Sequence, residues 1–91
     1  MDGRQEDAQQ RIAELRGLID DVDRKMVALL NERAENSLAI RELKPVIDKP
    51  LYDPKREEEI LARLAEINEG PLFDDNVREI YDTILHVMKE L

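Results

Sequence analysis

Two polar residues interrupt an otherwise apolar pattern in the first half of the chain, and one of them is an arginine. Large apolar side chains recur there at heptad spacing in two columns. The columns are Ile12, Ile19, Met26, Arg33 and Ile40, and Leu15, Val22, Leu29, Asn36 and Leu43. A buried arginine is costly unless its charge is compensated. Arg33 therefore either sets the register of a helical pair, with an acid such as Glu32 or Glu35 as partner, or binds an anionic ligand in a bundle cavity. Its planar guanidinium suits a carboxylate.

Two further cations belong to the same stretch. Lys44 follows Arg33 by eleven residues, which at about 100° per residue places both on one helix face, about three turns apart. Arg16 lies beside the apolar seam, about 25 Å from Arg33 along a helix axis. Arg16 and Arg33 cannot bind one small ligand within one chain, but they can if a second copy runs antiparallel. Taken alone, Arg16 and Lys44 are typical of solvated surface cations.

A short charged segment forms a second group of candidate binding residues. Asp53 precedes Pro54, a combination typical of a helix N-cap followed by the first helical residue. Arg56 and Glu57 follow within the first turn, where the surrounding charged run is typical of a solvated face. Near the end of the chain, Met88 is typical of a helix core position.

Three helices must position these residues. We expect a long helix from about Asp7 to about Lys44, ended by Pro45, with residues 1–6 as a loose tail. A loop over 45–52 follows, then a helix that begins at Asp53 and Pro54 and ends at Gly70 and Pro71. A third helix begins near Asp74 or Asp75. The predicted fold class is all-α, one domain over 1–91, with one long and two short helices per chain.

The long helix needs a partner that one chain cannot supply. At 1.5 Å per residue it would extend roughly 55 Å, too far to bury its apolar stripe within a compact monomer. A chain of 91 residues has in any case a marginal core. We therefore expect a homodimer in which a second copy covers the stripe.

The composition excludes several functions. The formal net charge of −8 argues against a nucleic-acid partner, because phosphate binding needs a basic face. There are no cysteines, which excludes thiolate chemistry, and the single His86 cannot form a metal site alone. No apolar run approaches the ~20 residues of a membrane span, and residues 1–11 lack the apolar region of a signal peptide. We expect a cytoplasmic protein with no membrane and no metal.

The ordered set of motifs resembles the all-helical chorismate mutases. The resemblance covers residues 12–91 and preserves the loop lengths. Its motifs in this sequence are Leu15-Arg16, Ile19-Asp20, Asp23, Leu29-Leu30-Asn31-Glu32-Arg33, Ile40, Lys44, Tyr52-Asp53-Pro54-Lys55-Arg56-Glu57, Ile60-Leu61, Asn68-Glu69-Gly70-Pro71-Leu72 and Ile80-Tyr81. The resemblance implies two intertwined chains, two active sites and no cofactor.

The resemblance also implies a site and a reaction, the rearrangement of chorismate to prephenate in aromatic amino-acid biosynthesis by the shikimate pathway. The reaction is concerted, so an enzyme accelerates it by holding the compact conformer and stabilising charge on the ether oxygen. Arg33 and Lys44 would share one site with Asp53, Arg56 and Glu57, while Arg16 would enter from the other chain. In this assignment the two arginines of the long helix bind the carboxylates, and Lys44 donates to the ether oxygen. Glu57 and the Asp53 region accept a hydrogen bond from the substrate hydroxyl, and Arg56 helps to order this part of the site.

The third helix departs from the family pattern. Met88 stands where a small or hydroxyl residue contacts the substrate, and the Gln or Glu that gives a second donor to the ether oxygen would fall one residue past Leu91. Three explanations are open: a weak enzyme, completion by another shikimate-pathway enzyme, or a domain of a longer bifunctional polypeptide. A different register would place His86 and Glu90 in the site instead.

Two alternative functions are considered: one shares this fold, and the other follows from the departure of the third helix from the family pattern. One is an isochorismate–pyruvate lyase, although the loop from Lys44 to Asp53 favours the mutase. The other is a catalytically weak helical regulatory module that needs a partner.

Overall fold

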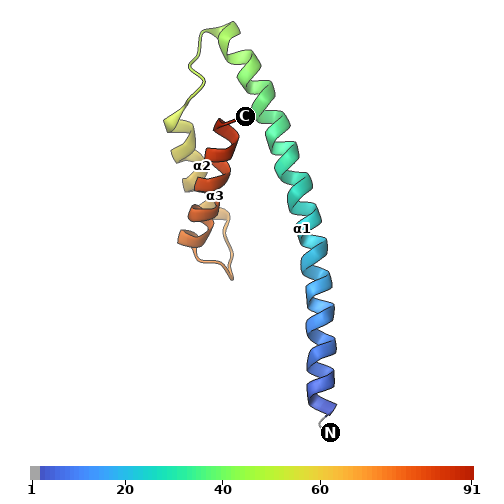
Figure 1. Ribbon diagram of the computed structural model, residues 1–91. Helices are drawn as coiled ribbons and strands as arrows, with labels where there is room; N and C mark the ends of the chain where they lie inside the picture. The colour runs from blue at the N-terminus through green and yellow to red at the C-terminus, as the bar shows by residue number, and fades with distance from the viewer. Residues whose placement is uncertain (1–2) are drawn as a thin grey trace. The chain divides into compact units, whose positions relative to one another are not determined.

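The computed structural model describes residues 3–91, which fold into three α-helices and one short 3-10 helix, with no strand among these residues (Figure 1). The elements are α1 (Gly3–Leu43), η1 (Lys44–Ile47), α2 (Pro54–Ile67) and α3 (Asp74–Lys89). The all-helical class with one long and two short helices is therefore confirmed.

The start of α1 differs from the sequence prediction. The helix begins at Gly3 rather than near Asp7, so residues 3–6 are helical and not a loose tail. Arg4, Gln5 and Glu6 are good helix formers, and Glu6 in the first turn interacts favourably with the helix dipole. The first two residues of the predicted tail lie outside the described residues.

The segment between α1 and α2 is more ordered than the predicted loop over 45–52. Lys44–Ile47 continues α1 as a 3-10 turn with Pro45 near its start. Asp48 then takes a left-handed conformation and its N–H donates to the Pro45 carbonyl at 3.2 Å. The N–H of Lys49 donates to the Lys44 carbonyl at 2.9 Å. Carbonyls at the end of α1 are thus satisfied locally, as is common at helix C-termini.

The turn between α2 and α3 is organised by Asn68. Its side-chain nitrogen donates to the Leu72 carbonyl and to Asp74 Oδ1, both at 2.8 Å, while its oxygen accepts from the Gly70 N–H at 3.2 Å. Gly70 has a φ of +81°, a conformation that side chains other than glycine rarely adopt, and the Gly70–Pro71 bond is cis. This turn brings α3 back along α2, and the two helices pack against each other (Figure 1).

The chain divides into two compact units, residues 1–33 and residues 34–91. In the second unit Leu85 is the one buried residue, at 8% exposure. Half-buried apolar residues from both short helices surround this small core: Ile60, Leu61, Leu64, Val77, Tyr81, Ile84 and Met88.

The described part of the first unit, residues 3–33, is a single helical stretch without a buried side chain. Its apolar columns are exposed: Ile12 is 47% accessible, Ile19 57% and Leu29 61%. Within one chain the heptad stripe therefore has no cover.

None of the helices in residues 3–91 has the length and apolar character needed to cross a membrane. The cytoplasmic location and the single domain over 1–91 stay predictions.

Candidate active site

The second unit contains a cleft of about 580 Å³ where α1 ends and α2 begins. Its lining is mostly apolar and includes two of the site residues expected from the sequence, Lys44 and Asp53. The lining residues are Ile40, Leu43, Lys44, Ile47, Lys49, Pro50, Tyr52, Asp53 and Pro54. The cleft thus combines apolar walls with two ammonium groups, a combination that suits a small organic anion.

Lys44 is held at this cleft by a backbone contact. Its side chain is half-buried, and Nζ donates to the Leu51 carbonyl at 2.8 Å. An ammonium group has three donors, so this bond fixes the group and leaves two for a ligand.

Asp53 performs the N-cap role expected from the sequence. Its Oδ1 accepts from the backbone N–H of Arg56 at 3.1 Å, and Pro54 is the first residue of α2. The Arg56 guanidinium lies 3.8 Å from Glu59 Oε2, and both of these side chains are more than half exposed. The cap is confirmed, while a substrate contact by Asp53 or Arg56 stays a prediction.

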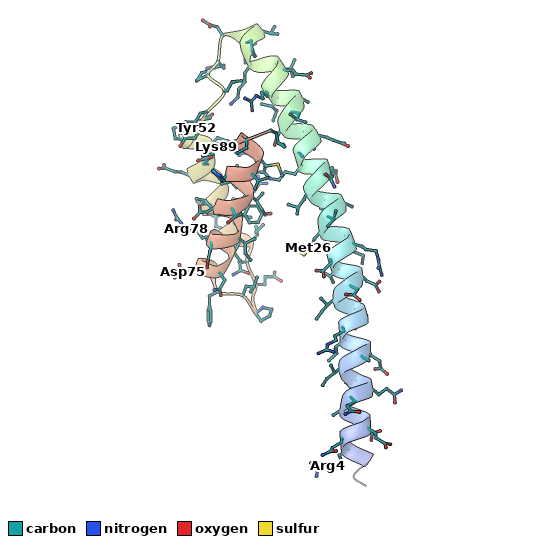
Figure 2. All side chains as sticks on the ribbon, in the orientation of Figure 1. Arg4, Met26, Tyr52, Asp75, Arg78 and Lys89 are labelled. Carbon is teal, nitrogen blue, oxygen red and sulfur yellow. The ribbon has the colours of Figure 1, made fainter. Side chains whose placement is uncertain are left out.

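Glu57 is more shielded than its neighbours in the charged run. Its side chain is 23% exposed, and Oε1 lies 3.1 Å from Nζ of Lys89 in the last turn of α3. The same ammonium lies 4.7 Å from the centre of the Tyr52 ring, a cation–π distance, and Figure 2 shows Lys89 and Tyr52 side by side. Neither Glu57 nor Lys89 lines the cleft; their link to it is Tyr52, which lines the cleft and contacts the Lys89 ammonium.

Sequence reasoning missed both Lys89 and Arg41. Arg41 Nη1 donates to the carbonyl oxygens of Leu91 at 2.6 Å and of Lys89 at 3.3 Å, and so satisfies acceptors at the C-terminal end of α3. A cation such as Lys89 is common in the last turn of a helix, and nothing in the local sequence of α3 indicates that Lys89 contacts Glu57 of α2.

The two arginines of the apolar seam belong to the first unit. Arg33 is half-buried and Arg16 is exposed. Neither side chain makes a hydrogen bond or ion pair within residues 3–91. One of the alternatives considered for Arg33, a pairing with Glu32 or Glu35, is therefore not observed within residues 3–91.

The orientation of α3 favours one of the two registers considered from the sequence. Met88 is half-buried, whereas the side chains of His86 and Glu90 are 69% and 70% exposed and lie 3.8 Å from each other. Met88, rather than His86 or Glu90, therefore points toward packed side chains. A substrate contact by Met88 stays a prediction.

The chemistry of this arrangement is that of binding and positioning. The second unit offers a fixed ammonium at an apolar cleft and, on α2, a shielded carboxylate, with no cysteine anywhere in the chain. These features suit a small helical protein whose ligand is a small organic anion.

Comparison with known proteins identifies the family of the chain. Residues 15–91 match the family described as chorismate mutase type II. The chain therefore belongs to the chorismate mutase family, and the expected resemblance is confirmed.

Individual relatives agree with the family. A bifunctional chorismate mutase/prephenate dehydratase of Neisseria gonorrhoeae is 39% identical over 70 residues, 77% of this chain and 19% of that protein. A chorismate mutase of Methanocaldococcus jannaschii is 36% identical over 70 residues, 75% of this chain and 69% of that protein. The structure of chorismate mutase (form II) from Thermus thermophilus superimposes with a TM-score of 0.86 at 40% identity, covering 89% of this chain and 92% of the other.

The chain spans only about a fifth of the length of the bifunctional relative that it matches.

Proposed function

We propose that this chain catalyses the rearrangement of chorismate to prephenate, as an isomerase without a cofactor. The observation that carries the proposal is Lys44, held by the Leu51 carbonyl at the wall of an apolar cleft. Membership of the chorismate mutase family supports the same reaction.

The proposed mechanism relies on positioning and electrostatics. Holding chorismate in its compact conformer can lower the barrier by up to ~7–11 kcal/mol in favourable cases. Lys44 donates to the ether oxygen as the C–O bond breaks, where one well-placed donor contributes about 3–4 kcal/mol. Glu57 accepts from the substrate hydroxyl, and Asp53 fixes the start of α2 that carries Glu57.

We propose that the site is completed by a second copy of the chain in an intertwined homodimer. The exposed heptad columns of α1 support this, because an apolar stripe of this length is stable in water only when it is covered. Arg33 then binds one carboxylate, and Arg16 of the second copy binds the other. Arg56 orders this region, and Met88 of α3 forms an apolar wall against the substrate.

The relatives suggest further context. The bifunctional relative joins the mutase to prephenate dehydratase, so we propose aromatic amino-acid biosynthesis in the cytoplasm as the setting. A fused domain or another shikimate-pathway enzyme is the proposed partner.

The test is turnover of chorismate, followed by the loss of its absorbance, with the wild-type chain and with Lys44→Met. We expect Lys44→Met to lower kcat by about 10²–10³-fold, because the donor to the developing oxyanion is lost. Lys55→Met is the matched control, because Lys55 is exposed, does not line the cleft, and its side chain makes no hydrogen bond or ion pair within residues 3–91.

Absence of wild-type turnover, alone and with candidate partner enzymes, would contradict the proposal. Equal losses in the two lysine variants would contradict the role of Lys44. Product analysis with isochorismate separates the mutase from the lyase.

A further inference from the structure

We propose that Lys89 is a positioning residue for the reaction, and that its ammonium group holds the Glu57 carboxylate in the orientation that receives the substrate hydroxyl. This inference rests on the proposed function. It concerns a residue to which the family resemblance assigns no role.

The ion pair between Lys89 and Glu57 differs in kind from other ion pairs of this chain. Four others join residues three or four positions apart on one helix, and every side chain in them is more than half exposed: Arg11–Glu14, Arg24–Asp21, Arg56–Glu59 and His86–Glu90. Exposed pairs of this kind contribute little. Lys89 and Glu57 instead join α3 to α2, with side-chain exposures of 45% and 23%.

Lys89 is held at both of its ends. Its ammonium lies against the Tyr52 ring at 4.7 Å as well as against Glu57 at 3.1 Å. Its backbone carbonyl accepts a hydrogen bond from Arg41 at 3.3 Å, and Arg41 comes from the end of α1. Three elements of the second unit thus fix the position from which Lys89 contacts the carboxylate. A long lysine side chain restrained in this way can orient its partner, whereas a free surface lysine cannot.

The contact leaves one carboxylate oxygen unused. Lys89 engages Oε1 of Glu57, and Oε2 accepts no hydrogen bond within residues 3–91. A carboxylate accepts at both oxygens, so fixing one of them orients the other. Glu57 does not itself line the cleft, but Tyr52, which does, lies under the same ammonium that contacts the Glu57 carboxylate. The geometry therefore links a residue of the last turn of α3 to the reaction without requiring it to touch substrate.

The experiment measures kcat and KM for chorismate with full-length Lys89→Met, Lys89→Arg and Lys55→Met. We expect Lys89→Met to lower kcat/KM about ten-fold, because a misplaced contact group costs one to two orders of magnitude. Lys89→Arg keeps the cation and should recover most of the loss. Lys55→Met removes the same charge from an exposed lysine whose side chain makes no ion pair within residues 3–91, and should leave kcat/KM unchanged.

A double-mutant cycle separates positioning from packing. If Lys89 acts through Glu57, Lys89→Met causes no further loss of kcat/KM in a Glu57→Gln background. An equal further loss there, wild-type kcat/KM in Lys89→Met, or a rise in kcat/KM would each overturn the inference. Circular dichroism of each variant verifies that the helices form. Wild-type turnover is measured first: its absence contradicts the proposed function, whereas turnover with an unaffected Lys89→Met contradicts the role of Lys89 alone.

Discussion

The two units of the chain differ in where their stabilising contacts come from. In residues 3–33 the ion pairs Arg11–Glu14 and Arg24–Asp21 are local to one helix, and the apolar columns are uncovered. In residues 34–91 the contacts are tertiary: α2 packs on α3, Leu85 is buried, and Arg41 and Lys89 connect separate elements. The second unit is partly self-supporting, whereas the first carries an apolar surface suited to another copy. We infer that α1 serves two purposes. Its exposed apolar columns in the first unit suit assembly, whereas Ile40 and Leu43 at its end line the cleft.

The largest expected effect comes from placing a charge on the uncovered stripe. Ile19→Glu should dissociate the proposed homodimer and abolish turnover, because two carboxylates would be buried at the seam. Sedimentation equilibrium measures the association state, and the chorismate assay measures activity. Gln10→Glu adds the same charge away from the apolar columns and should leave both unchanged. A wild-type monomer, or an active and dimeric Ile19→Glu chain, would show that the stripe has another purpose.

A smaller effect is expected in the core of the second unit. Leu85→Ala truncates the one buried side chain found among residues 3–91 and should lower the free energy of unfolding by about 2–3 kcal/mol. His86→Ala, at the next position but with an exposed side chain, should change it by less than about 0.5 kcal/mol. Urea denaturation at one fixed protein concentration compares the two, since the stability of a dimer depends on concentration. Similar values for both variants would mean that α3 is stabilised mainly from outside this unit.

Local features of the sequence predicted the helices well. Heptad spacing and the Asp53–Pro54 cap each depend on neighbouring residues, and the observed starts of α2 and α3 follow the prediction. The end of α2 does not: the helix ends at Ile67, with Asn68 as its C-cap, and not at Gly70 and Pro71. The start of α1 was misplaced because residues 3–6 lack the apolar spacing by which the helix was recognised, although they favour helix by propensity. Propensity without periodicity is a weak signal.

The N-cap at Asp53 is the contact of the candidate site that local sequence predicted and the structure confirms. The ammonium of Lys44 and the cap at Asp53 lie close in the sequence to the groups they contact. The contacts of Glu57 with Lys89, and of Arg41 with the end of α3, join residues far apart in the chain and depend on how the turn at Asn68 returns α3 to α2. No spacing rule within one helix reveals such a pair. The same holds for Arg33, whose interruption of the apolar column indicates a special position without naming the ligand or partner.

The smallest expected effect separates two roles of one residue at the start of α2. Asp53→Ala should lower the free energy of unfolding by about 1 kcal/mol, because the Arg56 N–H loses its acceptor. Asp53→Asn keeps an equally good N-cap but removes the charge, so its stability should match the wild type. If Asp53 serves only as a cap, Asp53→Asn also keeps the wild-type kcat/KM. If its carboxylate contributes to binding the substrate hydroxyl, as the family resemblance implies, Asp53→Asn loses activity at unchanged stability. Thermal unfolding and chorismate kinetics on this pair therefore decide whether the second unit uses Asp53 for folding alone or for both folding and binding.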